Sequence, residues 1–133
     1  MINCIFLKLL FFIHTSNEIL KIPYLDIAAS YVGCYKDSSE RDLDGGFLNQ
    51  GTSYERSYTP MSCVTACKGK GFVYAAVQYS GQCFCGDSYG KYGQTPESDC
   101  NRPCLKNESE TCGGVWRNNV YKTGYPIKQK GSL

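Results

Sequence analysis

Four cysteines in the middle of the chain restrict its fold more than any other feature. The first pair, Cys63 and Cys67, is spaced C-x-x-x-C, and the second pair, Cys83 and Cys85, is spaced C-x-C. On a helix, residues four apart share one face with Cβ atoms about 5–6 Å apart. On a strand, residues two apart point the same way, about 6.6 Å apart at the usual rise. The spacing therefore predicts a helix joined to a strand by two neighbouring disulfides, without deciding which cysteine pairs with which.

The residues around the first pair predict where this helix begins and ends. Thr59-Pro60 is typical of a helix start, because Thr caps the first N–H groups and Pro at the first helical position loses no hydrogen bond. Gly69 and Gly71 are suited to a left-handed turn that ends the helix.

The second pair lies in a predicted β-hairpin. Residues 72–79 are β-branched and aromatic, which favours a strand, and Ser80-Gly81 is a turn signal. Residues 82–86 return as the second strand of the hairpin. The predicted order is helix, strand, turn and strand, with the helix linked to the second strand.

The cysteine count points to a disulfide framework. Cys4 lies in an apolar N-terminal stretch, and the other eight cysteines form an even set between Cys34 and Cys112. Such a dense, even set predicts an oxidising compartment. Zinc is the alternative, but zinc sites favour C-x-x-C knuckles or histidines. The sequence has no C-x-x-C, and its one histidine, His14, lies outside the block, so we expect no metal and no cofactor.

The chain divides into a leader, one domain and a tail. Residues 1–30 are interpreted as an atypical signal segment, because the run CIFLKLLFFI has the length of a signal-peptide core and is too short to span a bilayer. The domain is expected over residues 31–122 and a polar tail over residues 123–133, with no membrane span. We expect a secreted protein, or a cell-surface one if the chain is a fragment of a longer membrane protein.

Charge and motif content argue against two classes of function. The formal net charge is +2, with acids and bases interspersed, so no basic stripe suggests nucleic-acid binding. From Tyr31 onward there is no histidine and no nucleophile motif. Asp37 with Asp42 or Asp44 is the one carboxylate pair worth considering, but these residues share a short loop rather than facing across a cleft. We expect no enzymatic activity.

The aromatic content suggests a binding surface instead. Eleven tyrosines, six phenylalanines and one tryptophan exceed what so small a core can bury. A sugar site needs a flat aromatic face for the C–H side of a pyranose and planar polar groups for its hydroxyls. The candidate carbohydrate-binding residues that supply these types are Tyr35, Asp37, Arg41, Tyr74, Gln78, Tyr79, Trp116, Asn118 and Asn119.

Several of these candidates also have a purely structural interpretation. Tyr35 suits a half-buried packing position, and Tyr74 and Trp116 suit the core as well as a ligand contact. Asp37 and Arg41 suit an ion pair that fixes a loop. The aromatic excess as a whole is stronger evidence for binding than any single residue.

A glycosylation signal lies between two cysteines near the C-terminal end of the block. Asn107-Glu108-Ser109 matches the N-x-S sequon and falls in a charged loop. It predicts a glycan on Asn107, in keeping with a secreted protein.

With the cysteines placed, residues 31–121 resemble a WSC domain, the module of fungal cell-wall stress sensors. The resemblance rests on YVGCYKD, RDL, CVTAC, QYSGQCFCG, TCGG and a closing VY. It implies a small disulfide-rich α+β fold, apple/PAN-like, with one helix stapled to an antiparallel sheet by two of four disulfides. The implied pairs are Cys34–Cys100, Cys63–Cys83, Cys67–Cys85 and Cys104–Cys112.

The resemblance also implies a function. It suggests a secreted or cell-surface module that binds a carbohydrate, with a glycan or cell-wall polysaccharide as the partner. The alternative is an extracellular protein–protein interaction module of a receptor ectodomain. A small toxin or inhibitor ranks third, because the cysteine block is long for that class.

Overall fold

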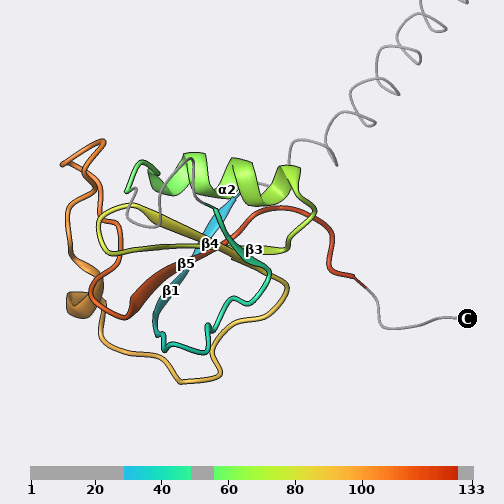
Figure 1. Cartoon of the computed structure of the whole chain (residues 1–133), viewed down its shortest axis with the longest axis horizontal. Coiled ribbons are helices and arrows are strands. Elements are labelled where there is room, and N and C mark those ends of the chain that lie inside the picture. The colour runs from blue at the N-terminus through green and yellow to red at the C-terminus, as the bar shows by residue number, and fades with distance from the viewer. Residues whose placement is uncertain (1–28, 49–55, 129–133) are drawn as a thin grey trace, which may run out of the picture.

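The computed structural model describes residues 29–48 and 56–128, which form one helix on a five-stranded antiparallel sheet. The strand order is β1-β5-β3-β4-β2. Figure 1 shows α2 lying over one face of the sheet. The elements are β1 Ser30–Lys36, β2 Gly46–Leu48, α2 Pro60–Gly69, β3 Tyr74–Gln78, β4 Gln82–Gly86, the 3-10 helix η1 Glu97–Cys100 and β5 Arg117–Lys122. This confirms the predicted α+β class, while residues 1–28 of the predicted leader lie outside the described residues.

The helix α2 begins and ends as its flanking residues predict. Thr59 Oγ1 accepts a hydrogen bond from the Ser62 amide (3.2 Å), and Ser62 Oγ accepts one from the Thr59 amide (2.9 Å). Pro60 is the first helical residue. Gly71, at φ 84°, makes the left-handed turn, whereas Gly69 is still helical. Among the described residues, no helix is both long enough and apolar enough to cross a membrane.

The hairpin of β3 and β4 matches the predicted one except at two ends. Strand β4 has the expected bounds, but β3 is shorter than the predicted 72–79. At its start, the Val73 amide donates to the Asp87 side chain (3.1 Å) rather than to a neighbouring strand. At its end, Tyr79 has a φ of 50° and already belongs to the turn.

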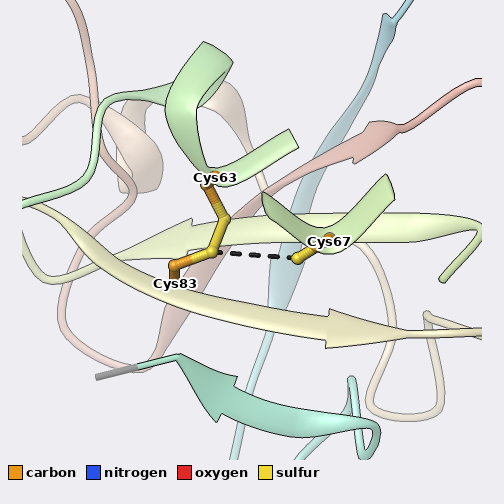
Figure 2. A group of neighbouring side chains, drawn as sticks. All are labelled: Cys63, Cys67 and Cys83. Carbon is orange, nitrogen blue, oxygen red and sulfur yellow. Dashed lines mark hydrogen bonds between the residues drawn. A yellow bond between two sulfur atoms is a disulfide. The ribbon is translucent and has the colours of Figure 1, made fainter. Parts of the chain in front are cut away.

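Two disulfides join α2 to β4 in the uncrossed arrangement. Cys63 pairs with Cys83 and Cys67 with Cys85, with Cα–Cα distances of 5.5 and 5.4 Å. The crossed alternative is close at hand, because Cys67 Sγ lies 3.8 Å from Cys83 Sγ (Figure 2). These sulfurs are consumed in disulfides, so they are not the thiolates that a zinc site needs. The remaining pairs are Cys34–Cys100 and Cys104–Cys112, which confirms all four implied disulfides.

Alternation along the strands gives the sheet two different packed faces. On the helix side, Ala75 and Val77 of β3 pack with the cysteines of α2 and β4. On the other side, Leu43, Phe84 and Val120 form a second cluster. The loops over this second face are tied together by Asp42, whose carboxylate accepts the amide hydrogens of residues 90 (2.8 Å) and 91 (2.9 Å).

Candidate functional site

A depression of about 320 Å³ lies where the turn after β3, the turn before β5 and the loop after β1 meet. It combines two aromatic rings, two amides and one guanidinium. We call it the Trp116 site, and its lining residues are Arg41, Gln78, Tyr79, Gln82, Val115 and Trp116. Four of the nine sequence candidates therefore line one site. A fifth, Asp37, forms an ion pair with the lining residue Arg41.

Trp116 is presented by a tight turn at the start of β5. The Gly114 amide donates to the Arg117 carbonyl (3.0 Å), and the Arg117 amide donates back to Gly114 (3.3 Å). Trp116 adopts a φ of 53°, which bulky residues rarely do, and 43% of its surface is exposed. Its carbonyl accepts the Asp37 amide (3.0 Å), which fixes the turn against the loop after β1. A large apolar side chain is thus held outward by a strained backbone.

Arg41 supports the Trp116 ring from within the protein. Its guanidinium carbon lies 4.9 Å from the Trp116 ring centroid and 4.5 Å from that of Phe84. Arg41 Nη1 donates to Asp37 Oδ2 at 2.7 Å, and the Asp37 side chain is only 1% exposed. Asp37 also accepts the Asp42 amide (2.9 Å). A buried carboxylate therefore fixes the guanidinium, and the guanidinium positions the indole.

Gln78 completes this ion pair. In the amide orientation that satisfies both of its ends, Gln78 donates to Asp37 Oδ2 (3.2 Å) and accepts from Arg41 Nη1 (3.1 Å). Only 3% of Gln78 is exposed. Its main effect is to hold Arg41 rather than to reach solvent.

Tyr79 also lines the site. It starts the β3–β4 turn, where its amide donates to the Gly114 carbonyl (3.3 Å) and the Ser80 amide donates to the Cys112 carbonyl (3.0 Å). The non-glycine residues with positive φ in the described chain are Tyr79, Ser80 and Trp116. Two of the three line this one depression, and such outliers cluster at functional sites.

A second depression, of about 470 Å³, continues from the first because both share Arg41 and Gln82. It includes Phe47, whose ring centroid lies 4.9 Å from that of Phe84 and which is 37% exposed. Sequence reasoning missed Phe47, Gln82 and Phe84. Phe84 could have been found, since a residue between two helix-facing cysteines must point to the other face of the sheet.

Tyr35 and Tyr74 belong to a separate aromatic cluster. Their ring centroids lie 4.9 and 4.7 Å from that of Tyr89. Both are half-buried beneath the loop that carries Tyr89. Burial, followed by the neighbouring Tyr89, raises the pKa of Tyr35. The structure does not bring these two residues to the Trp116 site.

Asn118 and Asn119, which the sequence offered as ligand contacts, lie within strand β5 and are buried. The reason is that β5 is an interior strand of the sheet, hydrogen-bonded to β1 along one edge and to β3 along the other. Asn119 Nδ2 donates to the Tyr31 hydroxyl (2.8 Å), and its Oδ1 accepts the Gly113 amide. Both asparagines lie where a ligand cannot contact them, with exposures of 1% and 2%.

The sequon lies in an exposed loop that the Cys104–Cys112 disulfide closes. Asn107 Oδ1 accepts hydrogen bonds from the Ser109 amide (3.2 Å) and the Ser109 hydroxyl (2.7 Å). Glycosylation of Asn107 stays a prediction, and the amide is on an accessible surface.

Comparison with known proteins places the chain in context. The model of the WSC domain family matches residues 31–114. The chain is 44% identical over 94 residues to xylosyltransferase oxt of Drosophila pseudoobscura pseudoobscura, covering 70% of this chain and 10% of that protein. A WSC domain-containing protein of Arthroderma benhamiae is 35% identical over 112 residues, covering 77% and 12%. Kremen protein 1 of Homo sapiens is 29% identical over 94 residues, covering 69% and 19%. The chain therefore spans less than a fifth of each of these relatives.

Proposed function

The chain belongs to the WSC domain family, and from that premise we propose that it is an extracellular glycan-binding module whose ligand lies on Trp116. Four disulfides in so small a domain support an oxidising, extracellular setting. The relative named xylosyltransferase oxt handles a sugar according to its name, which is in keeping with a glycan-directed module.

One observation carries the proposal: an exposed indole rests on a guanidinium that is itself locked by a buried carboxylate. Because Trp116 and Arg41 are already ordered, a ligand that stacks on the indole does not have to order them. The amide of Gln82 provides a planar hydrogen-bonding partner for ring hydroxyls, whereas that of Gln78 is bonded to the ion pair. This is the pairing of a flat apolar face with polar groups that a pyranose requires.

The carboxylates of Asp37 and Asp42 serve the fold, which supports binding rather than catalysis. Asp37 is bound by Arg41 and by the Asp42 amide. Asp42 is bound by two backbone amides of the loop after β4. Neither carboxylate stands across a cleft from the other, as a glycosidase pair would.

An extracellular protein partner is the second candidate, favoured by the apolar residues at the rim. Val115, beside Trp116, is 59% exposed, and Phe47 in the adjoining depression is 37% exposed. Clusters of exposed aromatic residues are also typical of interface hot spots.

Retention on insoluble polysaccharide tests the proposal. We expect the native, disulfide-intact protein to be pulled down by β-glucan or chitin, and Trp116→Ala to weaken retention about tenfold, which corresponds to about 1.4 kcal/mol. Tyr125→Ala is the matched control, because Tyr125 is a comparably exposed aromatic (38%) that does not line the site. Absence of retention on every polysaccharide, together with tight capture of a defined protein through Trp116, would favour the second candidate instead.

A further inference from the structure

Two guanidinium groups converge on Tyr79 at the edge of the Trp116 site. The Arg102 guanidinium carbon lies 4.4 Å from the Tyr79 ring centroid, and that of Arg56 lies 4.9 Å from it. Cation–π contacts of this length hold a guanidinium by its flat face. The N–H groups lie at the edge of that plane, so they stay available to an acceptor.

Backbone hydrogen bonds bring these two arginines to the turn from distant parts of the chain. The Tyr58 amide donates to the Gly81 carbonyl (3.1 Å), which places residues 56–58 beside the turn. The Arg102 amide donates to the Gly113 carbonyl (2.9 Å) on its other flank. Gly81 is needed for this approach, because a Cβ there would lie 2.8 Å from the Arg56 carbonyl oxygen. The convergence is therefore built into the fold and does not depend on flexible side chains alone.

The two arginines give this rim of the site positive charge. In the described part of the chain, neither Arg56 nor Arg102 takes part in an ion pair with a carboxylate. The ion pairs found there are Arg41–Asp37, Arg117–Asp99 and Lys128–Asp87. Arg41 is thus neutralised inside the site, whereas the charge beside Tyr79 is left for a ligand.

We infer that the glycan bound at the Trp116 site is acidic and that Arg56 and Arg102 bind its carboxylate or sulfate group. The inference rests on the proposed function, since Trp116 contacts the sugar ring while the two guanidiniums contact its anionic substituent. Guanidinium matches the planar geometry of a carboxylate and the oxygen edge of a sulfate through paired N–H donors. The two arginines lie beside the indole because the Tyr79 ring that both contact lines the same depression as Trp116.

The test compares polysaccharides that share a backbone and differ only in charge. The probes are a neutral β-1,3-glucan, its sulfated derivative and its carboxymethyl derivative, each immobilised, with the disulfide-intact full chain as analyte. We expect the sulfated or carboxymethylated polymer to bind at least about tenfold more tightly than the neutral one, since charge-assisted hydrogen bonds are the stronger kind. The two charged arms show whether sulfate or carboxylate is preferred.

Three variants identify the residues responsible. Arg56→Gln/Arg102→Gln is expected to remove the preference for the charged polymers and to keep weak retention on the neutral one. Arg56→Lys/Arg102→Lys, which keeps the charge but loses the planar donors, is expected to recover only part of the preference. Lys68→Gln/Lys70→Gln removes the same charge from exposed positions at the end of α2 and is expected to change nothing.

The outcomes separate this inference from the proposed function. If the neutral polymer is retained through Trp116 but the charged ones bind no better, the acidic-ligand inference fails and the glycan site stands. Two other results also overturn the inference, because charge alone would then explain retention. One is an equal loss of binding to the charged polymers in the lysine control. The other is binding to the charged polymers that Trp116→Ala leaves intact. If no polymer of either kind is retained, the proposed function fails and this inference fails with it.

Discussion

The two faces of the sheet are stabilised by different means. On the helix side, two disulfides join α2 to β4 and the packing between them is apolar. On the opposite side, near the Trp116 site, a partly buried ion pair between Asp37 and Arg41 supports the rings of Phe84 and Trp116. Disulfides fix the helix side without any exposed surface. On the other side, the ion pair holds the Trp116 ring in place while it faces the solvent.

The contrast suggests that the helix side stabilises the fold so that the other side can carry strained, exposed residues. A disulfide is worth about 2–4 kcal/mol. A non-glycine residue in a left-handed conformation costs about 1–3 kcal/mol, and the exposed residues Tyr79 and Trp116 adopt that conformation. The stabilisation by two helix–strand disulfides is therefore large enough to offset the free-energy cost of such strain.

A large effect is expected from removing one helix–strand disulfide. Cys63→Ser/Cys83→Ser opens a link with a sequence separation of 20 residues, and we expect the free energy of unfolding to fall by about 3 kcal/mol. Urea denaturation monitored by circular dichroism measures it. Cys104→Ser/Cys112→Ser opens a link with a separation of only 8 residues, so its loss should be smaller. An equal or larger loss from the short link would contradict the dependence on loop length.

The next largest loss of stability is expected from breaking the ion pair between Arg41 and Asp37 on the opposite side of the sheet. Arg41→Met leaves the Asp37 carboxylate buried without its cation, and we expect a loss of about 1.5–3 kcal/mol, the range for a hydrogen bond to a charged group. Retention on polysaccharide should fall as well, because the indole loses its support. Adding Asp37→Asn should restore part of the stability, which a double-mutant cycle measures. Strictly additive losses would show that the two residues do not act together.

Two substitutions of Trp116 separate the backbone strain at this residue from its contribution to binding, with a smaller expected effect on stability. Trp116→Ala and Trp116→Gly both remove the indole, so both should lose glycan retention. Only glycine adopts a φ of 53° freely, so Trp116→Gly should be more stable than Trp116→Ala by about 1 kcal/mol. Thermal and urea unfolding of the two variants provide the comparison. If Ala is the more stable of the two, the turn is not strained.

The smallest expected effect on stability comes from a surface ion pair near the C-terminal end of the described chain. The hydrogen bond from Lys128 (2.7 Å) is the main cause that lowers the pKa of Asp87, and the Val73 amide adds to it. A carboxyl whose pKa is lower in the folded state stabilises the fold above its unfolded pKa and loses that contribution as the pH falls through the folded value. Because both side chains are largely exposed, we expect less than about 1 kcal/mol.

Asp87→Asn should therefore reduce stability at neutral pH and flatten the acid limb of the stability curve below about pH 4. Urea unfolding at several pH values measures this. Glu108→Gln, at an exposed position outside the ion pairs of the described residues, is the control. An unchanged acid limb in Asp87→Asn would show that the pair contributes nothing.

Local patterns were sufficient to predict the helix, the hairpin and disulfides between them, whereas the choice of cysteine pairs came from the family resemblance. The capping residues Thr59 and Pro60 and the two cysteine spacings depend on geometry within a few residues, so they can be read without the fold. The N-terminal leader and the glycan on Asn107 remain predictions.

The sequence by itself determined the scaffold, because the periods of helix and strand fix which side chains share a face. Only the tertiary structure decided which aromatic residues are available. Tyr35 and Tyr74 are covered by Tyr89, while Trp116 is held outward on Arg41. Exposure depends on which distant segments pack over a residue. The strand order and the approach of Arg56 and Arg102 to Tyr79 also depend on distant segments, so a short stretch of sequence does not predict them.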